Sequence, residues 1–416
     1  MKDHESVRAP EDCLAEAVGL AEAIDLEVTY AESFKLSRRH PAHYLGKGHC
    51  EDIRTFVDQR RPTVIVVNCA LSPVQQRNLE KFWHSKVIDR TGLILEIFGA
   101  RAQTREGRLQ VDLAALEFQR SRLVRAWTHL ERQRGGGGFL GGPGERQIEL
   151  DRRMISEKIG RLKKELEDVR RTREIGRKAR ERVPFPVVAL VGYTNAGKST
   201  LFNTLTQAGV LAEDMLFATL DPTLRRIILP NGQHVILSDT VGFISDLPTN
   251  LVAAFRATLE QTLHADVILH VIDVSRTDSK AQREDVIKIL QDLGISYHED
   301  ARIIEVYNKI DQLDPSRVDE LARQAHHAPH MALISALSGK GLPELLEKIS
   351  AVTAGKRQTV RFQMPHADGK ALSWLYEHGE IIARVDHETM LECTVKLDSV
   401  DLARFVDRTG YVPQSL

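Results

Sequence analysis

The sequence contains little cysteine and no long apolar run, and both absences exclude classes of protein. Cysteine occurs only four times in 416 residues, at Cys13, Cys50, Cys69 and Cys393. Because no two of them form a CxxC pair, we expect neither a structural disulfide nor a zinc site. A membrane-spanning helix needs about 18 or more apolar residues in a row, and no stretch approaches that length. The charged first residues lack the apolar centre of a secretory signal, so we expect a cytoplasmic protein.

Aromatic residues make up only 6% of the chain, but 42% of the residues are hydrophobic and 28% are charged, which is typical of folded globular domains. The length suits about two to four domains. The net charge is −1, yet residues 101–183 contain 22 Lys and Arg against 13 Asp and Glu, a local charge of +9, and the remainder carries −10. Such a basic segment favours a polyanion, for example nucleic acid, as partner. A solvated helical face would account for the charges equally well.

Residues 1–108 alternate between strand-like and helix-like patterns, which predicts a small α/β subdomain. Ser72 is expected to cap a helix whose first residue is Pro73. The other elements that we expect are a helix at Gly48–Asp58 and strands at Leu26–Tyr30, Thr63–Asn68 and Leu93–Phe98.

Residues 109–183 carry a heptad pattern that predicts two helices packed antiparallel as a coiled-coil-like arm. Leucine recurs every seven residues at positions 116, 123 and 130, and a second apolar seam contains Ile148, Ile155, Ile159, Leu162, Leu166 and Val169. Between the helices, residues 135–144 read GGGGFLGGPG, and seven glycines in ten residues cannot sustain a helix. This stretch is either a plain linker or a flexible tip that presents Phe139 and Leu140.

Residues 184–356 alternate strands and helices regularly, whereas residues 357–416 indicate a small α+β domain of the order βαββα. The strands that we expect in the larger domain are Val187–Val191, Val267–Asp273, Ile303–Tyr307 and Met331–Ser335, with a hairpin around Asn231-Gly232.

A phosphate-binding P-loop is indicated by GYTNAGKS, which follows the strand VVALV and precedes the helix-like run STLFNTL. Its glycines allow the backbone to wrap around phosphates with the N–H groups pointing at the anion. Lys198 is expected to bridge the β- and γ-phosphates, and Ser199 is expected to bind Mg²⁺. The predicted nucleotide-binding residues of this loop are Gly192, Tyr193, Thr194, Asn195, Ala196, Gly197, Lys198, Ser199 and Thr200.

A preference for guanine is indicated by Asn308-Lys309-Ile310-Asp311, which lies at the end of the strand RIIEVY. Asp311 can accept hydrogen bonds from guanine N1–H and the 2-amino group, and adenine offers neither donor. Lys309 can lie over the base, and Asn308 can brace the P-loop. The turn that follows the next strand is expected to offer backbone N–H groups to guanine O6, from Ser335, Ala336 and Leu337.

The two switch segments are expected between these motifs. Asp239-Thr240-Val241-Gly242 fits the pattern DxxG, in which Asp239 holds Mg²⁺ through water and the Gly242 N–H meets the γ-phosphate. The first switch is expected at Phe217, Ala218, Thr219, Leu220 and Asp221. Thr219 is our choice for the second Mg²⁺ ligand beside Ser199, and Thr223 is its rival. The predicted catalytic residues are Lys198, Thr219 and Gly242.

Hydrolysis of GTP needs a positioned water molecule. Phe243 stands directly after the DxxG motif, where many GTPases have glutamine, and its ring cannot orient water by hydrogen bonding. We therefore expect slow intrinsic hydrolysis that a partner accelerates. The predicted fold class is α/β: a P-loop GTPase domain, preceded by a small α/β subdomain and a helical coiled-coil arm and followed by a small α+β C-terminal domain.

Several of these segments together resemble the HflX family of ribosome-associated GTPases. They are GYTNAGKSTLFNTLT, FATLDPT, DTVGFI, LPTNLVAAFRATLEQT and NKID, with Phe243 after DxxG and the segment GPGERQIELDRR before the domain. The resemblance departs at Arg146, where the family usually has threonine.

The resemblance implies a protein that binds the 50S subunit or the 70S ribosome, contacts ribosomal RNA through the basic arm, and hydrolyses GTP in a ribosome-stimulated way. It also implies splitting or rescue of stalled ribosomes under stress, with large-subunit biogenesis as an alternative, and a cytoplasmic location with association to ribosomes or peripherally to membranes. We expect a monomer. The residues also leave open a P-loop ATPase or small-molecule kinase, and an RNA chaperone that scarcely hydrolyses nucleotide.

Overall fold

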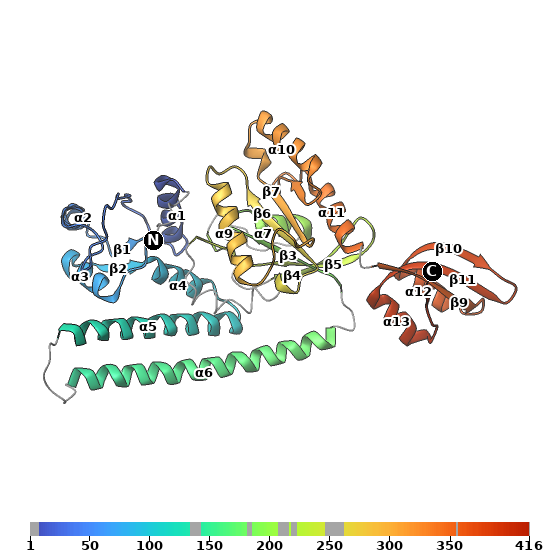
Figure 1. The fold of residues 1–416 in the computed structure, drawn as a ribbon, viewed down its shortest axis with the longest axis horizontal. Helices are drawn as coiled ribbons and strands as arrows, with labels where there is room; N and C mark the ends of the chain where they lie inside the picture. The colour runs from blue at the N-terminus through green and yellow to red at the C-terminus, as the bar shows by residue number, and fades with distance from the viewer. Residues whose placement is uncertain are drawn as a thin grey trace.

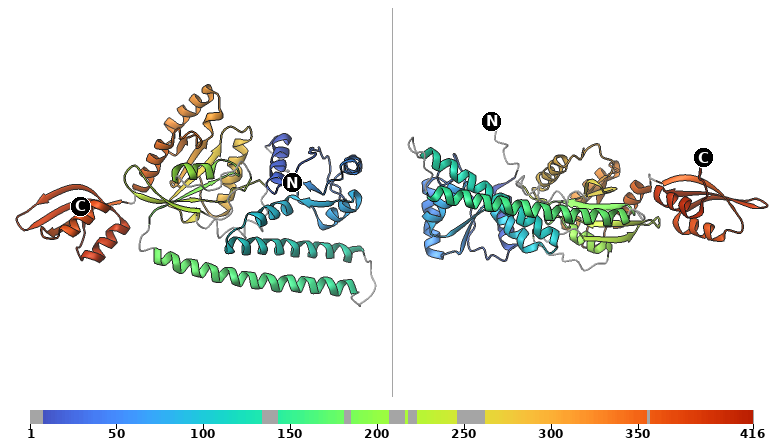
Figure 2. Two further views of the ribbon diagram at one scale, coloured as in Figure 1. Left: turned by 180° about the vertical axis from the view of Figure 1, so that it is seen from behind. Right: turned by 90° about the horizontal axis from the view of Figure 1, so that it is seen from below.

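The computed structural model describes residues 8–133, 143–180, 185–206, 216–217, 223–245, 262–354 and 357–415. An N-terminal unit and a central sheet domain lie side by side, and two long helices run along the lower side of both in Figure 1. The C-terminal unit projects from the opposite end, and the same arrangement is visible from behind and from below in Figure 2.

The N-terminal unit is built around two short parallel strands. Its elements are α1 (Pro10–Glu22), α2 (Lys47–Arg60), β1 (Val64–Val67), α3 (Pro73–Trp83), β2 (Lys86–Asp89) and α4 (Arg90–Arg101). Ser72 caps α3, because its side chain accepts from the Gln75 N–H while the Gln75 side chain accepts from the Ser72 N–H. The predicted helix at Gly48–Asp58 and strand at Thr63–Asn68 are confirmed by α2 and β1.

Two strands predicted for this unit are wrong. Residues 26–30 form no strand, and Tyr30 instead stacks on Phe56 of α2 at a ring distance of 4.3 Å. Leu93–Phe98 belongs to α4, which Asp89 begins by accepting a hydrogen bond from the Gly92 N–H. Because α4 is covered on several sides, nearly all of its apolar residues are buried, and a short continuous apolar run looks the same in a buried strand and a buried helix.

The predicted pair of antiparallel helices is confirmed. α5 (Arg105–Gln133) and α6 (Pro143–Arg180) lie side by side. Their seam buries Leu109, Leu113, Ile159 and Leu166, with Leu116, Ile155, Leu162 and Val169 packed around them. Residues 134–142, which include most of the glycine-rich stretch, lie outside the described residues.

The central domain contains a six-stranded sheet in the order β4-β5-β3-β6-β7-β8, parallel except for the β4-β5 hairpin. Its strands are β3 (Val187–Gly192), β4 (Thr223–Ile228), β5 (His234–Asp239), β6 (Val267–Asp273), β7 (Ile303–Asn308) and β8 (Met331–Leu333). Its helices are α7 (Lys198–Thr206), α9 (Ser279–Asp292), the short 3₁₀ helix η1 (Ile310–Gln312), α10 (Pro315–His327) and α11 (Leu342–Ala354). The predicted strands and the hairpin at Asn231-Gly232 are confirmed, with β8 two residues shorter than expected.

Different helices cover the two faces of the central sheet. α7 and α11 pack on one face, where Leu201, Phe202, Leu345 and Ile349 join one buried cluster. On the other face, α9 shares a buried cluster with residues of α1, α4 and α5, namely Leu20, Ile94, Phe98 and Ala114 among others. One continuous apolar core therefore joins the N-terminal unit to the central domain.

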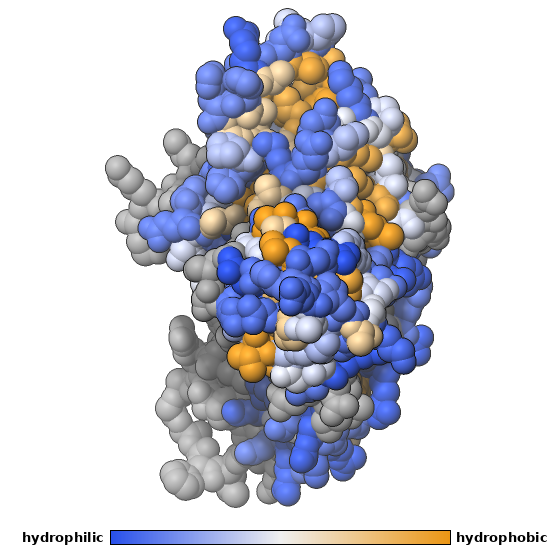
Figure 3. Space-filling view, turned by 90° about the vertical axis from the view of Figure 1, so that its right-hand side faces the viewer, coloured by the Kyte–Doolittle hydropathy of each residue, from blue (hydrophilic) through white to orange (hydrophobic). Residues whose placement is uncertain are grey.

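The C-terminal unit has the predicted order, followed by a short final strand. Its elements are β9 (Arg357–Pro365), α12 (Gly369–His378), β10 (Glu380–Asp386), β11 (Met390–Asp398), α13 (Ser399–Thr409) and β12 (Gln414–Ser415), and the sheet order is β10-β11-β9-β12. Seen from this end, the surface is mainly hydrophilic with small hydrophobic patches (Figure 3). None of the helices in the described part of the chain combines the length and apolar character that spanning a membrane requires.

Candidate functional site

The loop between β3 and α7 wraps closely around a cradle of backbone groups. Gly192 has φ of 154°, and a Cβ there would lie 2.3 Å from the Val271 carbonyl oxygen. Gly197 has φ of 92°, and a Cβ there would lie 2.2 Å from Asn308 Nδ2. A side chain at either position would therefore collide with neighbouring atoms. The loop ends at the N-terminus of α7, where backbone N–H groups favour an anion.

Lys198 is the first residue of α7 and is almost fully buried in this cradle. Its ammonium donates to the carbonyl oxygens of Gly192 at 3.2 Å and Tyr193 at 2.8 Å. Burial lowers the pKa of Lys198 to about 8, and the nearby Asp239 carboxylate opposes this shift. A buried cation at a helix N-terminus is suited to a phosphate group.

Two oxygen groups meet beside the cradle. Ser199 Oγ donates to Asp239 Oδ2 at 2.8 Å, and Asp239 is completely buried at the end of β5. Thr240 is held by donating to the Leu190 carbonyl oxygen at 2.5 Å. Hydroxyl and carboxylate oxygens are the ligands that Mg²⁺ prefers, so this pair fits the predicted magnesium site.

The segment after Asp239 lies directly on the P-loop. Phe243 N–H donates to the Gly192 carbonyl oxygen at 3.0 Å, and Thr194 N–H donates to the Phe243 carbonyl oxygen at 2.7 Å. A Cβ on Gly242 would lie 2.9 Å from Thr194 Cα and 3.0 Å from Lys198 Nζ. Gly242 thus lies in contact with the same residues that form the cradle.

Asn308 connects the P-loop to the turn after β8, which is predicted to contact the base. Its Nδ2 donates to the Ala196 carbonyl oxygen, and its Oδ1 accepts from the Ala336 N–H, both at 2.9 Å. Lys309 has left-handed backbone angles, and its ammonium lies 2.8 Å from Asp273 Oδ2. Asp311 follows in η1 and is exposed, while Ile310 is buried.

Two backbone N–H groups of the turn after β8 already donate hydrogen bonds within the protein. Ser335 N–H donates to the Lys340 carbonyl oxygen at 2.9 Å, and Ala336 N–H is the donor to Asn308. Leu337 is 81% exposed. A base at this place would therefore either share the Ala336 N–H with Asn308 Oδ1 or replace Asn308 as its acceptor.

Part of the predicted first switch lies outside the described residues, namely Ala218, Thr219, Leu220 and Asp221. Phe217 is described and packs edge-on against Phe98 of α4 at a ring distance of 4.7 Å. Thr223, the rival of Thr219, begins β4 and pairs with Asp239 in the strand register.

Asp273 lies beside the candidate site, and motif reasoning missed it. It ends β6, is buried, pairs with Lys309 and also accepts from the N–H and hydroxyl of Ser275. The sequence could have indicated Asp273 by its position at the end of a predicted strand. A carboxylate that ends a parallel strand lies at the same edge of the sheet as the neighbouring loops.

Comparison with known proteins gives matches along nearly the whole chain. The matching family models are the GTP-binding GTPase N-terminal region (residues 11–99), the GTP-binding GTPase middle region (101–180), the 50S ribosome-binding GTPase (187–309) and the HflX C-terminal domain (320–415). GTPase HflX of Magnetococcus marinus is 48% identical over 402 residues, which cover 95% of this chain and 91% of that protein. The chain belongs to the HflX family of GTPases.

GTPase HflX of Escherichia coli is 46% identical over 340 residues, covering 81% of this chain and 78% of its own length. A crystal structure of a GTP-binding protein from Sulfolobus solfataricus in complex with GDP aligns at 24% identity and a TM-score of 0.45, covering 83% of this chain and 97% of that one. The prediction of a GTP-hydrolysing enzyme with a P-loop GTPase domain is confirmed by the family.

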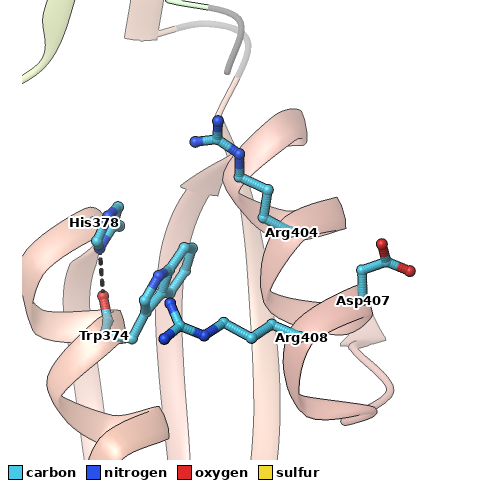
Figure 4. Close-up of a pocket in the computed structure, with 5 residues that line it drawn as sticks. All are labelled: Trp374, His378, Arg404, Asp407 and Arg408. Carbon is cyan, nitrogen blue, oxygen red and sulfur yellow. Dashed lines mark hydrogen bonds between the residues drawn. The ribbon is translucent and has the colours of Figure 1, made fainter. Parts of the chain in front are cut away.

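A separate open pocket of about 430 Å³ lies on the C-terminal unit, between α12 and α13. It is lined by Trp374, His378, Arg404, Asp407 and Arg408 (Figure 4). The rings of Trp374 and His378 stack at 4.1 Å. None of the predicted nucleotide-binding residues lines this pocket, which therefore does not belong to the nucleotide site.

Proposed function

We propose that this GTPase works on the large (50S) ribosomal subunit, that ribosomes accelerate its hydrolysis of GTP, and that it splits or rescues stalled ribosomes under stress. The observation that carries the proposal is the match of residues 187–309 to a 50S ribosome-binding GTPase. The helices α5 and α6 support it, because residues 101–183 are positively charged and RNA is negatively charged. A ribosomal partner would place its work in the cytoplasm. The protein acts as a monomer in this proposal.

In the proposed site, the β- and γ-phosphates lie in the cradle formed by Gly192–Thr200 and meet the Lys198 ammonium. Ser199 and Thr219 would hold Mg²⁺ directly and Asp239 would hold it through water, and the ion would offset the negative charge of the phosphates. Support comes from the 2.8 Å contact between Ser199 and Asp239 and from the burial of Lys198.

The guanine base lies between Lys309 and the turn at Ser335, Ala336 and Leu337. Asp311 accepts from the base N1–H and 2-amino group, and Asn308 keeps the base segment in register with the P-loop. The Lys309–Asp273 ion pair supports this arrangement, because it fixes the lysine stem beside the space for the base.

The partner is needed for hydrolysis because Phe243 offers no hydrogen bond to water. It is buried and pairs with the P-loop backbone, so a group from elsewhere has to orient the attacking water. We propose that the ribosome supplies or positions this group.

The basic arm is the proposed contact with ribosomal RNA. Residues 101–183 carry +9, and binding through Lys and Arg to phosphates weakens as salt rises. The proposed working division is an α/β subdomain at 1–108, the arm at 109–183 with its tip at 135–144, the GTPase domain at 184–356 and the C-terminal domain at 357–416.

The test is GTP turnover by the full-length protein alone, with 50S subunits and with 70S ribosomes, using ATP as the control substrate. We expect slow turnover alone and strong stimulation by ribosomes, with GTP preferred. GTP turnover that ignores ribosomes would contradict the proposed partner and leave the GTPase. Equal turnover of ATP would contradict the role given to Asp311.

A further inference from the structure

A buried carboxylate of the N-terminal unit touches both loops that would face the phosphates. Glu16 lies on α1, and its Oε2 accepts a short hydrogen bond from the hydroxyl of Tyr193, the second residue of the P-loop. Its Oε1 accepts from Ser245 Oγ at 3.0 Å. The Ser245 N–H donates in turn to the Tyr193 hydroxyl oxygen at 2.8 Å. Ser245 is three residues after Gly242, so one side chain of α1 holds the P-loop and the DxxG segment together.

Two arginines complete this contact. Arg90 donates to Glu16 Oε1 at 2.7 Å and to the Ser245 carbonyl oxygen at 2.9 Å. Arg8 donates to Glu16 Oε2 at 3.1 Å and lies over the Tyr193 ring at 4.9 Å. The side chains of Glu16, Arg90 and Arg8 are only 7–8% exposed. Burial and the nearby Glu16 carboxylate raise the pKa of the Tyr193 hydroxyl, which keeps it protonated as a donor.

A third contact reaches the first switch. Phe217 packs against Phe98 of α4, and Leu216 lies beside Gly19 of α1. The N-terminal unit therefore touches the P-loop, the start of the first switch and the end of the DxxG segment. It does so through a core that is continuous with the sheet domain.

The DxxG segment that this network holds lies closed against the P-loop. Thr194 N–H is bonded to the Phe243 carbonyl oxygen, and Gly242 lies in contact with Thr194 and close to the Lys198 ammonium. Lys198 itself donates to two loop carbonyl oxygens. For Gly242 N–H and Lys198 to meet one γ-phosphate between them, the segment has to move away from the P-loop, and Ser245 moves with it. That movement strains or breaks the bonds of Ser245 to Glu16 and Arg90.

We infer that Glu16 is a positioning residue of the GTPase site: through Tyr193 and Ser245 it stabilises the closed DxxG segment, and it thereby favours GDP over GTP until the N-terminal unit shifts. GDP has no γ-phosphate and leaves the closed segment in place, whereas GTP has to open it. A contact that is made in only one of two conformations shifts their populations by its differential energy. Any force that moves α1 relative to the P-loop then promotes the GTP-bound conformation.

The test measures nucleotide affinity of the full-length protein without ribosomes, so it is independent of the proposed ribosomal partner. The primary variant is Glu16→Gln, which keeps the shape and removes the charge that faces Arg8 and Arg90. Affinities for GDP and for a non-hydrolysable GTP analogue are measured by fluorescence titration. We expect the preference for GTP analogue over GDP to rise about fivefold or more, within the usual range of coupling between sites. Glu22→Gln is the matched control, because Glu22 lies on the same helix and is exposed.

Ser245→Ala removes one hydroxyl from the other side of the same contact and decides the question if Glu16→Gln does not fold. It should change the same ratio in the same direction, and the double variant should give less than the product of the two single effects, because both remove one interaction. An unchanged ratio in folded Glu16→Gln, or in Ser245→Ala when Glu16→Gln is unfolded, would overturn the inference. A uniform loss of affinity for both nucleotides would overturn it too, because that pattern indicates a merely structural role.

Discussion

At the scale of single residues, Asn308 shows how few side chains hold the nucleotide site in register. It is buried, and its one amide group joins the P-loop at Ala196 to the turn at Ala336 that is proposed to contact the base. Its Nδ2 also occupies the space that a Cβ on Gly197 would need, so the absence of a side chain at 197 and the presence of the amide at 308 depend on each other. One side chain therefore links motifs that lie far apart in the sequence.

Asp311→Asn should change which base is accepted. The amide can donate to the 2-oxo group of xanthine, whereas the guanine amino group then faces another donor. We expect GTP affinity to fall about tenfold to a hundredfold, as for an unpaired polar group in a complex, and xanthosine triphosphate to bind better than in the wild type. Competition against fluorescent GDP measures both. Asp314→Asn is the control, because Asp314 is exposed three residues away. An unchanged preference for GTP would disprove the role of Asp311.

Lys198 should make nucleotide binding depend on pH. Its pKa is lowered to about 8 by burial, and bound phosphate stabilises the charged form and raises that pKa. Below pH 8 the lysine is charged in both states, so affinity for GDP is constant. Above pH 8 binding has to take up a proton, and affinity should fall toward tenfold per pH unit. Titrations between about pH 7 and about pH 9 measure this in the wild type.

The control for this pH profile is Lys198→Arg, because a guanidinium stays charged throughout the range. Its remaining affinity, even if weak, should show no change of slope near pH 8. A wild-type profile that stays flat above pH 8 would mean that Lys198 remains protonated in the free protein, and the fall in affinity would then be absent.

At the scale of elements, the arm is held by a narrow apolar seam, because α5 and α6 are otherwise highly charged. Ile159 is 3% exposed in this seam, so Ile159→Ala should destabilise the arm by about 2–4 kcal/mol through the lost contacts and the cavity. Hydrogen exchange of α6 amides measures this locally, which matters because a chain with several units does not unfold in one step. Met154→Ala, at a residue 66% exposed on the same helix, should change exchange little. If the α6 amides were equally protected from exchange in both variants, the apolar seam would not be what stabilises the arm.

The elements also show where sequence patterns suffice. Heptads predicted the arm, and strand-loop-helix motifs predicted the sheet domain, because those signals are long or chemically specific. Leu93–Phe98 was misassigned because its burial comes from packing between two units, which a short apolar run does not reveal. The grouping of Lys198, Ser199, Asp239 and Asn308 followed from motif order. Glu16, Arg90 and Ser245 belong to no motif, and only the packing of α1 against the P-loop brings them to the site.

At the scale of the whole molecule, the central domain makes two different kinds of connection. The N-terminal unit shares its buried core and touches the P-loop, whereas the helical pair joins that core through residues of α5 such as Ala114 and runs along the side of both units. The glycine-rich stretch in the sequence between the two helices, residues 135–144, contains only two apolar side chains, Phe139 and Leu140, among glycines and one proline. A plain linker needs neither side chain, and a probe that contacts the ribosome needs both.

Replacing both residues, Phe139→Ser with Leu140→Ser, separates these roles without shortening the connection between the helices. Intrinsic GTP turnover should remain within about twofold, because both residues lie outside every nucleotide motif of the sequence. Ribosome-stimulated turnover and splitting of 70S ribosomes, followed by sedimentation, should fall at least about tenfold, since a buried aromatic anchor commonly contributes about 2 kcal/mol or more to an interface. A length-matched variant in which Gly137 and Gly138 become serine is the control and should retain stimulation. If the Phe139/Leu140 variant split ribosomes as well as the wild type, the stretch would be a linker, and contact with the ribosome would have to come from the charged faces of α5 and α6.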